Sequence, residues 1–296
     1  MFIIQYRKFF IALSLFLMTV SLGAVVLFGL PLGIDFKGGS SLELSYTTAR
    51  PEVSVIKEAL VLAGYEDAVV QPTGESTIVI KNKELTEEGR AEVVLAVGTT
   101  GEVVQQGFTM IGPSVGAELR NKAIIAVLLS LLAIICFVAY AFRKVSEPVS
   151  SWKFGLAVIL ALVHDIVIPL GAFATIAHFT GAELDTLFIV ALLTTLALSI
   201  SDTIVVFDRV REHLGNNKKQ AFPELVGESL KETFARSVNT SVVVLVMVIS
   251  LAVFGPESTQ LFATVLAIGM FFGTYSSIFL ASPLLVMMEQ AQKKEK

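Results

Sequence analysis

The sequence predicts an α-helical integral membrane protein with six transmembrane helices and one α+β domain between the first two of them. Two observations lead to this fold class. The chain has six long apolar runs, and only 16% of its 296 residues are charged, against about 25% in an average soluble domain. Between the first and second runs, by contrast, about ninety residues have the polar composition and the alternation of a soluble domain.

The rest of the composition argues against several classes of function. A net charge of −4 gives no indication of nucleic-acid binding. The single cysteine, Cys136, lies within an apolar run, and the three histidines form no metal-binding motif. We therefore expect no metal, no cofactor and no covalent catalysis.

The first apolar run covers residues 9–30 and follows Arg7 and Lys8. About 22 residues can span a hydrocarbon core of ~30 Å, whereas a signal peptide has a shorter apolar region and a small-residue cleavage site. We expect residues 1–30 to form a cytoplasmic amino terminus and a retained first helix, which Pro31 and Gly33 end.

Residues 31–121 are predicted to form the α+β domain. Residues 41–46 alternate apolar and polar side chains with the period of two that is typical of a half-buried strand. The expected elements are strands at 41–46, 68–71, 77–80 and 102–111 and helices between 51 and 64 and at 85–97. This βαββαβ order is that of a ferredoxin-like domain, in which two helices cover one face of a sheet.

Five further apolar runs predict the rest of a helical bundle over residues 122–287, followed by a cytoplasmic tail at 288–296. The runs cover residues 123–142, 154–177, 184–207, 238–254 and 261–287. Pro169 interrupts the second of these, but neighbouring helices can satisfy the freed backbone groups in a membrane protein. The polar connection at 208–234 is expected to contain a surface helix.

The distribution of basic residues predicts the orientation in the membrane. Basic residues gather after the second and fourth helices and in the tail: Arg143, Lys144, Lys153, Arg209, Arg211, Lys218, Lys219, Lys231, Lys293, Lys294 and Lys296. The opposite connections, 180–185 and 255–258, hold acidic residues and no basic ones. Because basic loops tend to stay in the cytoplasm, both termini are predicted to be cytoplasmic and the α+β domain extracytoplasmic.

Three ionisable residues, Asp165, Asp202 and Arg236, lie in or at the edge of apolar runs. Such groups are costly in hydrocarbon and often mark an ion or proton path. At 1.5 Å of rise per residue, Asp202 and Arg236 lie at matching depths of roughly 7 to 9 Å on consecutive antiparallel helices. We therefore expect these two to approach each other, with Asp165 nearer the middle of the membrane.

Polar residues flank both charges at helical spacings of three and four. The two predicted stripes are Ser199, Asp202 and Thr203 on one helix and Arg236, Asn239 and Thr240 on the next, with Ser201 beside the first. Two such stripes could line a hydrated path. An aspartate whose arginine partner approaches and withdraws would take up and release protons as the helices move.

Three other interpretations of these residues stay open. Asp202 and Arg236 could form a static pair that only holds helices together. Oxygen atoms of Asp202, Ser201 and Thr203 could bind Na⁺ instead of exchanging protons. Two aspartates also suggest an aspartyl protease, but neither has the flanking residues of such an enzyme, and Arg236 would oppose proton sharing.

Several motifs, in order from residue 33 to 241, resemble the SecF family of the bacterial Sec protein-export machinery. Residues 33–40 match the family signature that follows the first helix, through Asp35, Phe36, Gly38 and Gly39. A second match comprises Gly112, Pro113 and Gly116. The remaining matches are Val163-His-Asp165, Ser201-Asp-Thr-Ile-Val-Val-Phe-Asp-Arg209 and Ala235-Arg-Ser-Val-Asn-Thr-Ser241.

The resemblance implies an RND-like half of six helices that pairs with SecD and associates with the SecYEG channel in the cytoplasmic (inner) membrane. It implies use of the proton-motive force to help a translocating polypeptide outward. Asp202 and Arg236 would be proton-relay positions, and Asp165 an auxiliary polar site. The chain departs from the usual family pattern at Ser201, where an asparagine is expected, and in the Lys-Glu-Thr-Phe-Ala segment before Arg236.

Two alternatives to an export motor remain. An RND-like exporter of small molecules would share the intramembrane charges, although about ninety residues are few for a drug-capturing vestibule. A structural assembly subunit would use the charges only to hold helices together, and apolar replacements of Asp202 and Arg236 would then preserve function.

Overall fold

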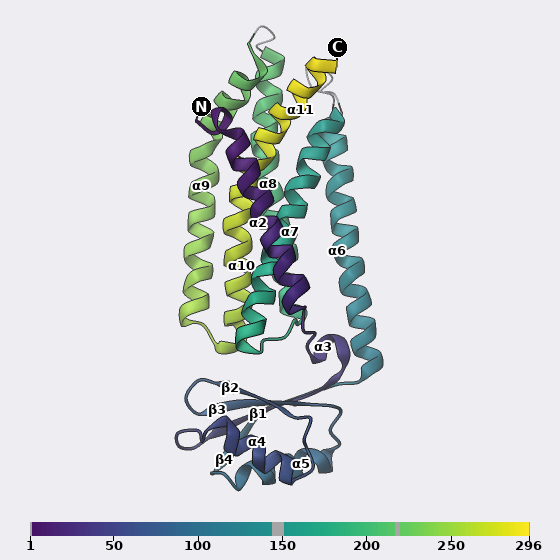
Figure 1. Ribbon diagram of the computed structural model, residues 1–296, viewed down its shortest axis with the longest axis vertical. Helices are drawn as coiled ribbons and strands as arrows, with labels where there is room; N and C mark the ends of the chain where they lie inside the picture. Colours follow the sequence, from purple (N-terminus) through teal and green to yellow (C-terminus); the bar gives the residue numbers. More distant parts are fainter. Residues whose placement is uncertain (1, 144–150, 217–219, 296) are drawn as a thin grey trace. The chain divides into compact units, whose positions relative to one another are not determined.

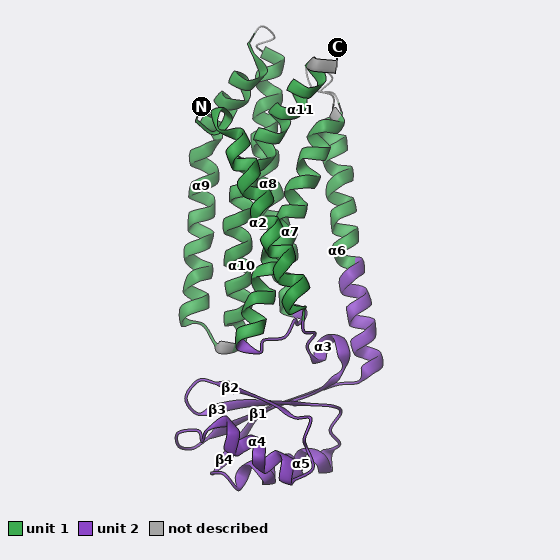
Figure 2. Ribbon diagram, in the orientation of Figure 1, with its two compact units in different colours: residues 1–30, 126–179, 187–296 green, residues 31–125, 180–186 purple. Residues whose placement is uncertain are grey.

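The computed structural model describes residues 2–143, 151–216 and 220–295, and the chain divides into two compact units (Figure 2). The larger unit comprises residues 1–30, 126–179 and 187–296, and the smaller comprises residues 31–125 and 180–186. The basic residues Lys144, Lys218, Lys219 and Lys296 of the orientation argument lie outside the described residues.

The larger unit is a bundle of long helices (Figure 1). Its elements are α1 (Phe2–Gln5), α2 (Arg7–Phe28), most of α6 (Pro113–Ala141), α7 (Ser151–Thr180), α8 (Thr186–Asn216), α9 (Phe222–Phe254), α10 (Glu257–Ser276), the π-helical turn η1 (Ser277–Ala281) and α11 (Ser282–Glu295). Six spans in the described residues are long and apolar enough to cross a membrane, the last formed by α10, η1 and α11 together. The six predicted helices are therefore confirmed.

The centre of the bundle is formed by α7, α8 and the last span. About half of each of these spans is buried, whereas α2, α6 and α9 are mostly exposed along theirs. Near one end, Phe154 of α7 stacks on Phe142 with centroids 5.2 Å apart and meets the edge of Phe207 of α8 at 5.3 Å. Helices with so much exposed apolar surface need lipid or other helices around them.

Helices α6, α8 and α9 extend well beyond their predicted apolar runs. The expected separate surface helix is wrong: α9 begins at Phe222, with Pro223 in its first turn, a position that proline favours. Phe222, Leu225 and Val226 are buried in the same core as the membrane-spanning residues. Because apolar residues three and four apart continue one helix face, packing prolongs the helix beyond the hydrophobic run. Helix α7 continues through Pro169, as expected for a proline inside a membrane-spanning helix.

The smaller unit is an α+β domain. Its elements are α3 (Ile34–Lys37), β1 (Gly39–Tyr46), α4 (Val53–Leu62), β2 (Val69–Thr73), β3 (Thr77–Asn82), α5 (Glu87–Gly98) and β4 (Val103–Ile111). The strands form an antiparallel sheet in the order β2-β3-β1-β4, and α4 and α5 lie on one face of it (Figure 1). This is the predicted ferredoxin-like arrangement.

The core of this domain follows from the alternation seen in the sequence. Leu42 and Leu44 of β1 and Ile78 and Ile80 of β3 are fully buried, because alternate residues of a strand point to the same face. They pack with residues of α4 and α5 in one apolar cluster. The Thr86 hydroxyl accepts a hydrogen bond from the Gly89 amide at 3.1 Å and so caps α5.

Candidate functional site

Asp165 of α7 is fully buried inside the bundle. Its Oδ2 accepts a hydrogen bond from the Ser199 hydroxyl of α8, and its Oδ1 lies 3.0 Å from Nδ1 of His164. His164 is equally buried, and its ring stacks against Tyr275 of α10 with centroids 6.0 Å apart. A buried carboxylate requires partners of this kind. Groups on α7 and α8 therefore keep an ionisable residue in the interior.

Hydroxyl groups extend this network to the last span. Ser277 Oγ lies 2.8 Å from Thr203 Oγ1 and 3.1 Å from the Ser199 carbonyl oxygen. Ser277 is the first residue of η1, and π-helical turns are rare and frequent at functional sites. Neither Ser277 nor the π-helical turn was predicted from the sequence. Serines at 276, 277 and 282 within an apolar run were the signal that could have found them.

Asp202 has different neighbours. It is half-buried on α8, and its Oδ2 accepts a long hydrogen bond of 3.4 Å from Ser241 of α9. Ser241 Oγ lies 2.6 Å from Thr274 Oγ1 of α10. The buried Ser237 hydroxyl is close to the same carboxylate without meeting hydrogen-bond geometry. Asp202 thus links α8 to α9, whereas Asp165 links α7 to α8.

The predicted stripe on the fourth helix is divided between these two groups. Ser199 and Thr203 meet Asp165 and Ser277, whereas Asp202 meets α9, and Ser201 is exposed. Successive helical residues point about 100° apart, so Asp202 and Thr203 cannot line the same narrow path. The structure therefore separates two polar groups on either side of α8.

Arg236 lies apart from Asp202. Arg236, Asn239 and Thr240 share an exposed face of α9, and no ion pair within 4.0 Å joins Arg236 to Asp202, both of which are described. The expected direct contact is absent, and the two charges interact at longer range. The α9 residues nearest Asp202 are Ser237 and Ser241, on the next face of the helix. The spacing of polar residues along the sequence could not give the rotation of the helix, on which these contacts depend.

The signature residues of the smaller unit lie where α3, β1 and α6 begin. Gly38 and Gly39 have φ angles of 80° and 135°, which favour glycine. A Cβ on Gly38 would lie 2.7 Å from Pro113 Cα, and one on Gly116 would lie 2.7 Å from the Gly38 nitrogen. These glycines let α3 pack directly on the first turn of α6. The remaining signature residues are Gly112, just before α6, the buried Phe36, and Asp35, which accepts hydrogen bonds from Thr186.

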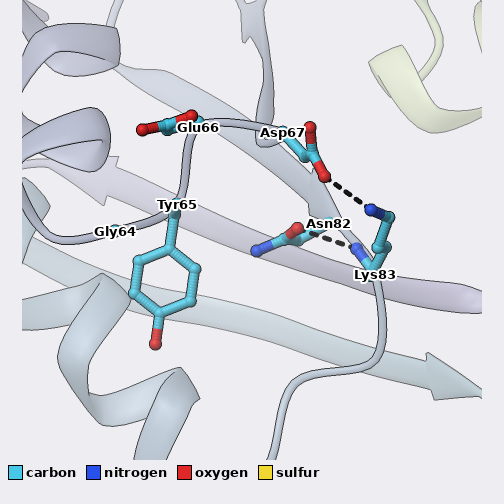
Figure 3. A pocket seen from close by; sticks show the side chains of 6 residues that line it. All are labelled: Gly64, Tyr65, Glu66, Asp67, Asn82 and Lys83. Carbon is cyan, nitrogen blue, oxygen red and sulfur yellow. Dashed lines mark hydrogen bonds and ion pairs between the residues drawn. The ribbon is translucent and has the colours of Figure 1, made fainter.

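A shallow pocket on the smaller unit is lined by Gly64, Tyr65, Glu66, Asp67, Asn82 and Lys83 (Figure 3). Lys83 Nζ lies 2.5 Å from Asp67 Oδ2, and this hydrogen bond and the lysine charge lower the pKa of the Asp67 carboxyl. Both side chains are highly exposed, so the ion pair contributes little to stability. We assign no function to this pocket.

The residues His164, Asp165 and Ser199 are of the types found in a hydrolytic triad, but their order differs. In such a triad the histidine bonds to the serine and accepts its proton. Here the carboxylate lies between the two, with Ser199 bonded to Asp165. The arrangement holds a carboxylate in place and lacks the serine–histidine hydrogen bond of such a triad.

These features define a class: membrane proteins with six spans, a small α+β domain and buried ionisable groups within the spans. Two family models match the chain, one described as "Protein export membrane protein SecD/SecF, C-terminal" over residues 93–291 and one as "SecD/SecF GG Motif" over residues 23–49. The chain belongs to the SecD/SecF family.

Individual relatives agree with this assignment. Protein translocase subunit SecF of Thermobaculum terrenum is 38% identical over 302 residues, which cover 97% of this chain and 93% of the relative. SecF of Pseudomonas aeruginosa is 34% identical over 284 residues, which cover 95% and 89%. SecDF of Brucella abortus is 33% identical over 265 residues, which cover 87% of this chain and 33% of the relative.

A solved structure has the same fold. The crystal structure of SecDF from Thermus thermophilus, described as a translocon-associated membrane protein, matches with a TM-score of 0.86 and 31% identity. The match covers 97% of this chain and 38% of that one, so this chain spans less than half of the SecDF length.

Proposed function

We propose that this chain is a SecF-type accessory subunit of Sec-dependent protein export that uses the proton-motive force to assist polypeptides across the cytoplasmic membrane. Membership of the SecD/SecF family and the names of the relatives support the export role. The observation that carries the coupling to protons is the pair of carboxylates, Asp165 and Asp202, placed within the membrane-spanning bundle. Carboxylates in that setting are typical of proton relays.

The two carboxylates suggest distinct roles. Asp202 is half-buried, the hydrogen bond that it accepts from Ser241 is long, and Arg236 acts on it from a distance. A weakly held carboxylate can change its protonation without breaking a network. Asp165 is fully buried and bonded to two side chains. We propose that Asp202 takes up and releases the proton as the permanently charged Arg236 approaches and withdraws. We further propose that Asp165, with Ser199 and Thr203, responds to the resulting movement of α8.

Depletion and rescue would test this function. Cells depleted of the subunit would be rescued with wild type, Asp202→Asn, Arg236→Met or Asp165→Asn, and export of a reporter preprotein would be measured together with membrane assembly. We expect at least about a tenfold loss of stimulated export for Asp202→Asn, because an amide cannot take up and release the proton and losing an acid–base group typically costs about 10²–10⁴-fold. Asp208→Asn is the matched control, because Asp208 lies on the same helix, is exposed and pairs with Arg211.

The outcomes separate the alternatives. Loss of wild-type stimulation on adding a protonophore supports proton coupling, and dependence on a sodium gradient would assign Na⁺ instead. If cells carrying Asp202→Asn and Arg236→Met export normally, the two charges only hold helices together. If depletion of the subunit leaves export unchanged but makes the cells sensitive to drugs, a small-molecule exporter is favoured instead.

We further propose that a SecD-type partner covers the exposed polar face of α9. Arg236, Asn239 and Thr240 form this face within or at the edge of a membrane span, where polar groups are costly next to lipid. The SecDF relatives, of which this chain covers about a third, suggest where a partner could come from. The SecYEG channel and the translocating polypeptide remain proposed partners of the assembly.

Co-purification of SecD with this chain would test whether a partner covers the polar face of α9. Thr240→Trp places a large side chain in the middle of the face and is expected to reduce recovery of SecD several-fold, since overpacking an interface costs about 1–3 kcal/mol. Leu128→Trp on the exposed surface of α6 is the control. Equal recovery with both variants would contradict the placement of the partner on α9.

A further inference from the structure

The signature segment binds the connection between α7 and α8. Within the smaller unit, the Gly33 amide donates to the Leu184 carbonyl at 2.8 Å, and the Leu184 amide donates to the Pro31 carbonyl at 2.7 Å. Gly33 lies so close that a Cβ would be 3.0 Å from the Leu184 oxygen. We call residues 31–37 together with 180–186 the outer clasp.

Charged side chains strengthen the outer clasp. Asp35 Oδ2 accepts hydrogen bonds from the Thr186 amide at 2.9 Å and the Thr186 hydroxyl at 2.8 Å. Thr186 is the first residue of α8, where unpaired amides and the helix dipole favour a carboxylate. Glu183, only 13% exposed, pairs with Lys37 at 2.9 Å and Lys81 of β3 at 3.0 Å. The connection is thus tied to both the signature segment and the sheet.

The helix held at its first residue by the outer clasp is α8, which also carries residues of the candidate site. Helix α8 runs without interruption from Thr186 to Asn216 and includes Ser199 and Asp202. Asp202 is sixteen residues from Thr186, roughly 24 Å along the axis at 1.5 Å per residue. Because a continuous helix resists stretching, holding its outer end limits how far these side chains can move along the axis.

We propose that Asp35 and Glu183 are positioning residues that keep the outer end of α8 attached to the α+β domain throughout the export cycle. This rests on the proposed function of α8 in export. It also assigns a physical role to the signature: Gly38 and Gly116 let α3 pack against α6, and the carboxylate of Asp35, three residues before Gly38, caps α8.

The test uses the full chain in its complex, with Asp35→Ala and Glu183→Gln as the loosening variants. The first readout is hydrogen exchange at the Thr186 amide, which should become at least about tenfold faster when its charge-assisted bond is lost. The second is preprotein export, which should fall several-fold with unchanged membrane levels. Asp67→Asn is the control, because it removes an exposed ion pair elsewhere on the same domain (Figure 3).

A charge reversal distinguishes positioning from general damage. Glu183→Lys alone places three lysines together and should lower export. Adding Lys37→Glu and Lys81→Glu restores both attractions with reversed signs and should recover export to within about twofold of wild type. A mutation that merely damages the domain would not be rescued in this way.

The results separate this inference from the proposed function. Faster Thr186 exchange with normal export would overturn the positioning role, and so would failure of the charge reversal to restore export in an assembled complex. Normal export with Asp202→Asn would instead remove the proposed function, while the exchange measurement would still report on the outer clasp. If Asp35→Ala does not accumulate in the membrane, the Glu183→Gln variant and the charge reversal test the positioning role in its place.

Discussion

Single residues determine how the bundle tolerates two carboxylates. Asp165 is surrounded by packed side chains and receives a hydrogen bond from Ser199, whereas Asp202 reaches only the edge of the buried region between α8 and α9. A buried charge that loses a donor has no water to replace it. The hydroxyl partners are therefore as important to the site as the acids themselves.

The Ser199 hydroxyl should contribute measurably to stability. Ser199→Ala removes the donor to Asp165 and is expected to lower the free energy of unfolding by about 1–3 kcal/mol. Thermal unfolding of the purified protein in detergent would measure this. Ser250→Ala is the control, since its exposed hydroxyl bonds only to Val246 of its own helix, and a change below about 0.5 kcal/mol is expected. Equal destabilisation by both would show that the Asp165 network is not stabilising.

At the scale of helices, small residues allow neighbouring helices to approach each other closely. A Cβ on Gly273 of α10 would lie 2.9 Å from the Ser199 Cβ of α8, and one on Gly171 of α7 would overlap the backbone of Ser21 of α2. Small residues allow backbones to approach in membrane proteins, where lipid supplies no hydrophobic drive for helix association. The polar networks of α8 depend on this proximity, because hydroxyl groups reach only short distances.

Two glycines of α7 provide a matched comparison. Gly171→Ala forces α2 and α7 apart and should destabilise the bundle by about 1–3 kcal/mol. Gly155→Ala has open space around the new methyl group and should be neutral or stabilising by up to about 1 kcal/mol, because alanine favours the helix. Unfolding in detergent checks both. A harmless Gly171→Ala would mean that α2 is not held closely against α7.

For the whole molecule, the orientation in the membrane decides what each end of α8 can contact. Our proposal that both termini are cytoplasmic and the α+β domain extracytoplasmic rests on the basic connections after the second and fourth helices. Under this orientation the outer clasp lies on the outside, and the carboxyl end of α8 lies in the cytoplasm. Asp202 would then lie on the helix that joins the outer clasp to the cytoplasmic side.

Cysteine labelling checks this orientation. In a Cys136→Ser background, Asp67→Cys in the small domain should react with a membrane-impermeant maleimide from outside, as both the position and the pocket around it are exposed. Glu212→Cys near the carboxyl end of α8 should react only after the membrane is opened. The reverse labelling pattern would contradict the proposed orientation.

Much of the fold could be predicted because the responsible signals are local. Apolar runs long enough to span a bilayer identified all six helices, and the alternation of Leu42 and Leu44 with polar residues identified the central strand. The helix ends were less accurate, since burial of Leu225 and Val226 prolonged α9 beyond its apolar run. The positions of Asp165, Asp202 and Arg236 inside or beside the spans also followed from the sequence.

The sequence by itself thus determined the six candidate spans and the order of elements in the α+β domain, because hydrophobic length and period are properties of a continuous segment. Tertiary structure decided which residues meet. It assigned Ser237 and Ser241, in place of Arg236, as the α9 neighbours of Asp202, and it brought Asp35 to Thr186 across 151 positions. Such contacts depend on the rotation of each helix and on packing between distant segments, and no local pattern encodes either.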